Sequence, residues 1–228
     1  AGCAPEGPLR AAAGDGGPSA LREVALADFD PSDQVWHWHA TVTEYAKIRW
    51  PISEEERRSR LLDLLPAWTA WLKRLPSGDA KSHVRLEKAR TNLLSEMEVC
   101  TGTSYEEAWA FLDALDGALP SPDRTLSLRE IIAEVQEAKL EILPSGQDKE
   151  RAGLLNNLGV ALSNLGRREE ALKPSQEAAE IYRRLAEKNP EAFLPDLASS
   201  LNNLGVYLSD LGRREEALKP SQEAAEIY

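Results

Sequence analysis

The chain has few of the residues on which reactive chemistry and covalent bracing depend. Its 228 residues include two cysteines, three histidines and one methionine. Two cysteines, one of them in a tail rich in alanine and glycine, do not make a disulfide framework, so we expect a reducing, cytoplasmic compartment. No Ser or Cys stands in a catalytic motif with a His, and no glycine loop follows a strand. We therefore expect no enzymatic activity and no cofactor.

Long apolar runs and clusters of positive charge are lacking as well. No apolar run approaches the roughly 20 residues that span a bilayer, which argues against a membrane protein. The net charge is −11, and residues 101–150 hold eleven acidic side chains against four basic ones. Because nucleic-acid binding needs clustered Lys and Arg, we expect no nucleic-acid partner. The apolar fraction of 42% fits a globular protein.

One short motif, HWH at 37–39, raises the question of a metal site. Apolar residues at steps of 3, 4 and 3 predict a helix over 33–50; they are Val35, Trp38, Val42 and Tyr45. On a helix, two histidines two residues apart diverge by about 200°, and no further ligand stands at a suitable spacing. We therefore predict no metal site. The tryptophans are expected to pack between helices, and an aromatic anchor for a partner is the alternative.

A long repeated phrase is the main feature that is present. Residues 155–182 recur at 201–228, which is 46 residues later, and only two positions differ. Ala161 becomes Tyr207, and Asn164 becomes Asp210. A unit that recurs at a fixed period predicts a stack of like elements, each burying the apolar face of its neighbour.

Within each copy the spacing predicts a hairpin of two helices. Leucines at steps of 3, 4 and 3 share one helix face, and Gly166 follows as a left-handed stop. Small residues at Gly159, Ala171 and Ala178 would let the second helix approach closely. Pro174 and Pro220 fall inside the second helix, where we expect a kink or a late helix start.

At these residues the sequence resembles the tetratricopeptide repeat family. The matching positions are Leu158, Gly159, Leu162, Gly166, Ala171 and Ala178 in the first copy, and Leu204, Gly205, Leu208, Gly212, Ala217 and Ala224 in the second. The family's usual period is about 34 residues. The longer unit here is similar to those of kinesin light chains and of bacterial multi-repeat proteins. The resemblance implies an all-α protein, a right-handed α-α superhelix, with a bacterial origin.

The extra residues of each unit have an expected place. They would lengthen the second helix to Lys188 and supply a connector over 189–196. In that connector, Pro190 would stop one helix and Pro195 would start the next.

Three regions are predicted along the chain. Residues 1–30 are mostly Ala, Gly and Pro and are interpreted as a flexible linker. Residues 31–145 are predicted to be helical, with further helices from Ser53 to about 75, over 80–99, over 104–118 and over 128–143; this region is interpreted as an N-terminal cap that includes a degenerate repeat. Residues 146–228 are the tetratricopeptide repeats, with the second copy cut short at Tyr228.

The resemblance places partner-binding residues on the first helix of each unit, which lines a concave groove in this family. They are Asn156, Asn157, Val160, Ser163 and Asn164, with Asn202, Asn203, Val206, Ser209 and Asp210 as counterparts. Asn suits this task because its amide both donates and accepts hydrogen bonds. The alternative is that these Asn side chains bond only to neighbouring turns or to water. The change from Asn164 to Asp210 would give the groove a graded charge.

The function implied is that of a protein–protein interaction scaffold, whose groove binds a partner peptide or protein segment. The alternative is the sensing or regulatory arm of a larger enzyme, a protease or NTPase, with its effector domain elsewhere; a third option is a small effector domain within 30–120. We expect the native protein to continue past both ends, since the sequence starts without Met and stops inside a unit. Replacing Asn156 and Asn202 with Ala is predicted to weaken partner binding without loss of helicity.

Overall fold

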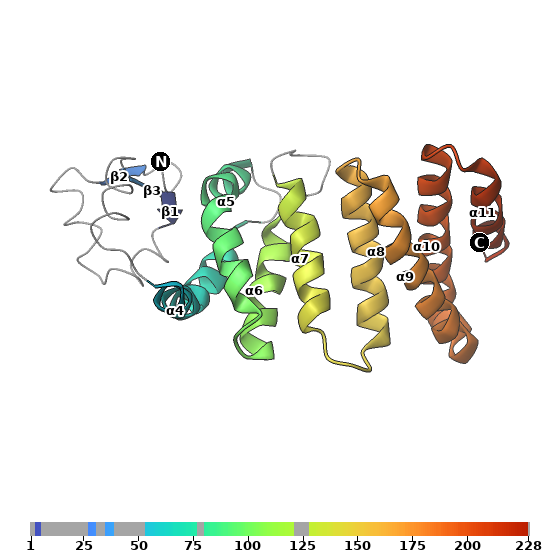
Figure 1. Cartoon of the computed structure of the whole chain (residues 1–228), viewed down its shortest axis with the longest axis horizontal. Helices are drawn as coiled ribbons and strands as arrows, with labels where there is room; N and C mark the ends of the chain where they lie inside the picture. The colour runs from blue at the N-terminus through green and yellow to red at the C-terminus, as the bar shows by residue number, and fades with distance from the viewer. Residues whose placement is uncertain are drawn as a thin grey trace. The chain divides into compact units, whose positions relative to one another are not determined.

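The computed structural model describes residues 3–5, 27–30, 35–38, 53–76, 80–120 and 128–227. The chain divides into two compact units, residues 1–121 and 122–228. Eight helices, α4 to α11, hold most of the described residues (Figure 1). The predicted all-α class, a helical repeat solenoid, is confirmed for these helices.

The helices of the first unit are α4 (Glu54–Leu72), α5 (Ala80–Cys100) and α6 (Tyr105–Ala118), close to the predicted bounds. Side-chain caps fix two of the starts. The hydroxyl of Ser53 accepts a hydrogen bond from the backbone N–H of Glu56 at 3.1 Å and so caps the helix predicted to begin at Ser53. Ser104 caps α6 in the same way, through the backbone N–H of Glu107 at 3.3 Å.

The core of the first unit lies where α4 faces α5 and α6. Its fully buried side chains include Leu72, Leu86, Leu93, Phe111 and Leu115. Trp68 is buried with them, and its ring meets that of Trp71 edge-on at a centroid distance of 5.6 Å. Trp68 thus packs between helices, as predicted. Because α6 packs mainly on α4 rather than on α5, this unit differs from a simple hairpin, and its origin as a degenerate repeat stays a prediction.

The helix predicted over 33–50 is wrong where the structure describes it. Strand β3 (Val35–Trp38) lies between β1 (Cys3–Pro5) and β2 (Ala27–Asp30) in an antiparallel sheet. A β-branched residue and two tryptophans in four positions favour a strand, and four apolar matches are too few to establish a helical period. Two of these strands also fall within the predicted linker over 1–30, so that prediction fails for their residues. His39, Val42 and Tyr45 lie outside the described residues.

The second unit is built from helix hairpins. Its helices are α7 (Arg129–Ile142), α8 (Asp148–Asn164), α9 (Arg168–Lys188), α10 (Pro190–Asp210) and α11 (Arg214–Ile227). Helix α8 packs on α9, α9 on α10, and α10 on α11, and α7 packs on α8. The two copies of the repeated phrase therefore form successive hairpins, α8–α9 and α10–α11.

Glycine closes the turn in both hairpins, as predicted. Gly166 and Gly212 each have a φ of 78°, a left-handed conformation that glycine adopts without a Cβ penalty. The N–H of Arg167 donates to the carbonyl of Leu162 at 2.9 Å, and the N–H of Gly166 to that of Ser163 at 2.9 Å. This pair of bonds satisfies the last carbonyls of the helix.

Close approach of the two helices depends on a second glycine. A Cβ on Gly159 would lie 2.3 Å from the Ser175 hydroxyl, and one on Gly205 would lie 2.3 Å from the Ser221 hydroxyl. The prediction that the small residue Gly159 lets the second helix approach closely is therefore confirmed.

The sequence predicts a kink or a late helix start for the proline-containing segments, and the late start is wrong. Helix α9 begins at Arg168 and α11 at Arg214, so Pro174 and Pro220 lie in the second turn of continuous helices. Proline removes one backbone donor there. Both proline rings are buried. Each proline therefore packs in the core at the same position where the helix lacks one backbone hydrogen bond.

The predicted connector over 189–196 is also wrong, because it is helical. Helix α9 ends at Lys188 as expected, but α10 starts at Pro190 and contains Pro195. Proline is well suited to the first position of a helix, where its missing N–H has no partner in any case. The extra residues of each unit thus lengthen both helices.

Candidate partner-binding groove

The predicted groove residues lie on the accessible side of α8 and α10. The leucines of these helices are buried on the opposite side, for example Leu158 and Leu204 at 8% exposure each. Six of the ten predicted residues are exposed and the other four are half-buried. The exposed ones are Asn157, Asn164, Asn202, Val206, Ser209 and Asp210, and the half-buried ones are Asn156, Val160, Ser163 and Asn203.

Two of the predicted residues contact each other across the repeat boundary. The side-chain oxygen of Asn156 on α8 accepts a hydrogen bond from the Asn203 amide on α10 at 3.2 Å. It accepts a second one from the hydroxyl of Ser200, also at 3.2 Å. This oxygen therefore joins the first helices of adjacent units. The counterpart of Asn156 in the next unit, Asn202, is exposed, so the two equivalent amides have different surroundings.

The copies differ in charge at one position, Asn164 in the first and Asp210 in the second, and the charged residue has an ion-pair partner. The Asp210 carboxylate on α10 accepts from the Arg168 guanidinium on α9 at 2.9 Å. In the first copy, the Arg129 guanidinium of α7 instead donates to the backbone carbonyl of Asn164 at 3.1 Å. The Asp210 carboxylate is thus paired with Arg168, and the graded charge of the groove stays a prediction.

The second difference between the copies, Ala161 in the first and Tyr207 in the second, lies in the core of the unit. Ala161 and Tyr207 are both buried in one cluster, which includes Ala133 of α7 and Leu172 of α9. Helix α8 packs against α7, whereas α10 packs against α9. Burial raises the pKa of Tyr207 to about 12. The change from Asn164 to Asp210 thus lies where the first helix meets the preceding helix, and the change from Ala161 to Tyr207 lies in the shared core cluster.

Sequence analysis missed the ion pairs that join the helices of this unit. The Arg183 guanidinium on α9 donates to both carboxylate oxygens of Glu223 on α11, at 2.8 and 3.0 Å. Its counterpart Glu177 instead accepts from Arg151 of α8, at 2.9 and 3.0 Å. The sequence does show the same glutamate in both copies, as Glu177 and Glu223. Its arginine partners, Arg151 and Arg183, are not equivalent positions of the repeat. Only the packing could show the pairing.

The part of the chain that the structure describes contains no group of three or more His, Cys, Asp or Glu side chains placed to hold a metal ion. Within the same residues no helix is both long enough and apolar enough to cross a membrane. Cys100 is buried, and its thiol contacts the Met97 carbonyl at 3.2 Å.

Helix hairpins that recur at a fixed offset of 46 residues and pack in succession define a helical repeat region. Residues 150–228 match the tetratricopeptide repeat family. The repeats predicted from the sequence are thus confirmed over this range, which covers α8 to α11. The comparison with known proteins finds no match to the chain among curated proteins and none among solved structures. The likeness to the long units of kinesin light chains stays a prediction.

Proposed function

We propose that the second unit is a protein–protein interaction scaffold, whose accessible side of α8 and α10 binds an extended or helical segment of a partner. Tetratricopeptide repeats generally mediate interactions between proteins. The observation that carries the proposal is the row of accessible predicted residues on α8 and the equivalent row on α10, which are joined by the two hydrogen bonds that Asn156 accepts. Solenoids present such surfaces for binding.

The chemistry of these rows suits a peptide backbone together with a small apolar side chain. Asn157 and Asn202 are exposed amides that both donate and accept. Val206, one turn beyond Asn202 on α10 and with an exposed fraction of 47%, supplies an apolar surface. A partner segment would bond to the amides and bury the Val206 side chain.

Of the two asparagines whose replacement by Ala is predicted to weaken binding, Asn202 gives the clearer test. Replacing Asn156 with Ala would remove the acceptor of Ser200 and Asn203, so a loss of binding would have two explanations. Replacing Asn202 removes an exposed amide only. We therefore expect Asn202→Ala to weaken binding by about twofold to tenfold, the range of one hydrogen bond, without loss of helicity.

The experiment starts from a peptide library displayed on phage and selected against the full chain. The affinity of a selected peptide is then measured for Val206→Asp and for Leu218→Asp. Leu218 on α11 is the matched control, since it is also an exposed apolar residue, at 59%, on a second helix of a unit. We expect at least a tenfold loss for Val206→Asp and none for Leu218→Asp. The opposite order, or equal affinity for both variants, would overturn the proposal.

We also propose a bacterial origin, a cytoplasmic location and, as a second candidate function, a regulatory role. The bacterial origin is supported by the sequence of the repeats, and the cytoplasmic location by the low cysteine content. The regulatory arm of a larger enzyme is the second candidate. It is favoured by the separate compact unit over 1–121, which the family match does not cover.

A further inference from the structure

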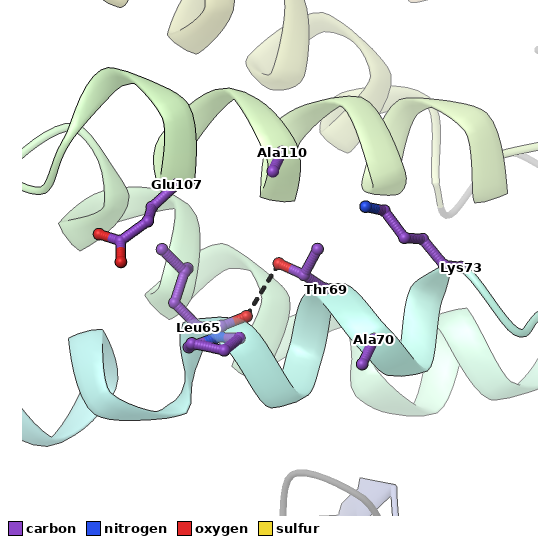
Figure 2. Close-up of a pocket in the computed structure, with 7 residues that line it drawn as sticks. Leu65, Thr69, Ala70, Lys73, Glu107 and Ala110 are labelled. Carbon is purple, nitrogen blue, oxygen red and sulfur yellow. Dashed lines mark hydrogen bonds between the residues drawn. The ribbon is translucent and has the colours of Figure 1, made fainter.

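The first unit has a trough between α4 and α6 that none of the features above explains. Its volume is about 360 Å³, within the usual range of ligand sites of about 300–1,000 Å³. Figure 2 shows that residues from one side of α4 face Glu107 and Ala110 of α6 across it. All of these residues belong to one compact unit.

Small side chains keep the trough open along its middle. Ala70 on α4 and Ala110 on α6 line it at places where larger residues would fill the space (Figure 2). The hydroxyl of Thr69 donates to the carbonyl of Leu65 at 2.9 Å. That bond occupies the only donor of Thr69. The middle of the trough is therefore predominantly apolar.

The two ends of the trough carry opposite charges. Glu107 lies at the Leu65 end and Lys73 at the other (Figure 2). Hydrogen bonds from Thr103 and Ser104 lower the pKa of the Glu107 carboxyl, so it is ionised at neutral pH. Lys73 is exposed. Leu65 and Lys73 are eight residues apart on one helix, which corresponds to about 12 Å.

The shape and exposure of the trough favour a chain over a compact ligand. Pro66 and Ala70 line it and are exposed, so a bound molecule would remain partly in contact with water. An extended peptide advances about 3.3 Å per residue, so three to four residues span about 12 Å. A segment with a basic and an acidic end would match both charges.

We propose that this trough is a second protein-binding site, which takes a short apolar peptide segment with a basic residue at the Glu107 end and an acidic residue at the Lys73 end. The site lies outside the matched repeats and does not depend on the function proposed for them.

The test uses three capped five-residue peptides with the full chain. Each has three apolar residues in the middle, and the ends are lysine and glutamate, two lysines, or two glutamates. We expect the mixed peptide to bind most tightly, and its addition to shift the backbone amide signals of Ala70 and Ala110 in NMR spectra. Because exposed ion pairs are weak, each mismatched end should weaken binding by about 1.5-fold to 5-fold. Equal affinity for all three peptides, or no binding of the mixed one, would refute the proposal.

Charge reversal gives the sharper arm of the test. Lys73→Glu should weaken the mixed peptide several-fold and strengthen the two-lysine peptide. Arg74→Glu is the matched control, because it makes the same charge change at the next position, which does not line the trough. Glu107→Gln should weaken binding of a basic end while retaining an oxygen that can cap α6. Equal effects of the Lys73 and Arg74 variants would overturn the site.

A third variant separates this site from the one on the repeats. Ala70→Leu fills the trough at an exposed helix position, so it should abolish binding of the mixed peptide with unchanged helicity in circular dichroism. Val206→Asp on α10 should leave that binding intact. If Val206→Asp removed it, the peptide would be bound by the repeats, and the trough proposal would fail while the scaffold proposal stood.

Discussion

At the scale of single residues, Glu96 is unusual because it carries a carboxyl group into the core of the first unit. Its side chain is 1% exposed, and one of its oxygens has no hydrogen-bond partner among the described residues. Burial raises the pKa of this carboxyl to about 8, against a smaller lowering effect of the hydrogen bond with Trp68. Glu96 is therefore mostly protonated at neutral pH in the folded chain.

This buried carboxyl predicts a pH dependence of stability. The folded state keeps the proton up to a pKa of about 8, whereas an unfolded chain loses it near 4.5. The first unit should therefore lose stability as the pH rises from 4.5 to 8, and no more above that. At about 1.4 kcal/mol per pKa unit, the upper limit of the loss is roughly 5 kcal/mol.

The variant Glu96→Gln should remove most of this slope. Urea denaturation of the full chain at pH 5 and at pH 9, followed by tryptophan fluorescence, measures it. Glu98→Gln is the control, since the Glu98 side chain is 67% exposed and should leave the slope unchanged. If Glu96→Gln retained the slope of the unmodified chain, the account of this residue would be wrong.

At the scale of elements, the repeated phrase shows how neighbours change the role of the same sequence. Leu172 on α9 is 7% exposed, while its counterpart Leu218 on α11 is 59% exposed. Ser175 is fully buried, and its counterpart Ser221 is exposed. The buried members of these pairs belong to α9, on which α10 packs. A substitution in one copy should therefore differ in effect from the same substitution in the other.

The two contact glycines make this difference measurable. Gly159→Ala would place a methyl group against Ser175, which is fully buried, and overpacking of this kind typically costs about 1–3 kcal/mol. Gly205→Ala meets Ser221, which is exposed and free to change rotamer, so the gain in helix propensity of up to about 1 kcal/mol should offset the contact.

Thermal denaturation followed by circular dichroism compares the two variants. We expect a clearly lower Tm for Gly159→Ala and little change for Gly205→Ala. Equal shifts for both would mean that the environment of the hydroxyl does not decide the effect.

Helices with strong local signals could be predicted from the sequence, and contacts between helices could not. Ser53 and Ser104 capped the predicted starts, and Gly166 ended α8 as its position indicated. Pro190 was misread because proline both follows helices and starts them, and the sequence alone does not distinguish the two. The Asn156–Asn203 contact depends on how α8 and α10 are rotated toward each other, which neither helix encodes by itself. The trough depends likewise on the packing of α4 against α6.

At the scale of the whole molecule, the chain combines a repeat unit with a unit of different construction. The family match covers α8 to α11, and the unit over 1–121 lies outside it. The account gives each unit its own peptide-binding surface, one with exposed amides on α8 and α10 and one with opposite charges at the ends of an apolar trough. The central claim is that the repeats bind a partner along the first of these surfaces.

An NMR chemical-shift map of the full chain, titrated with the peptide selected by display, tests that claim most directly. The account predicts that the largest amide shifts fall on α8 and α10, near Asn157, Val160, Asn202 and Val206. Shifts confined to α9 and α11, or to the first unit, would contradict it.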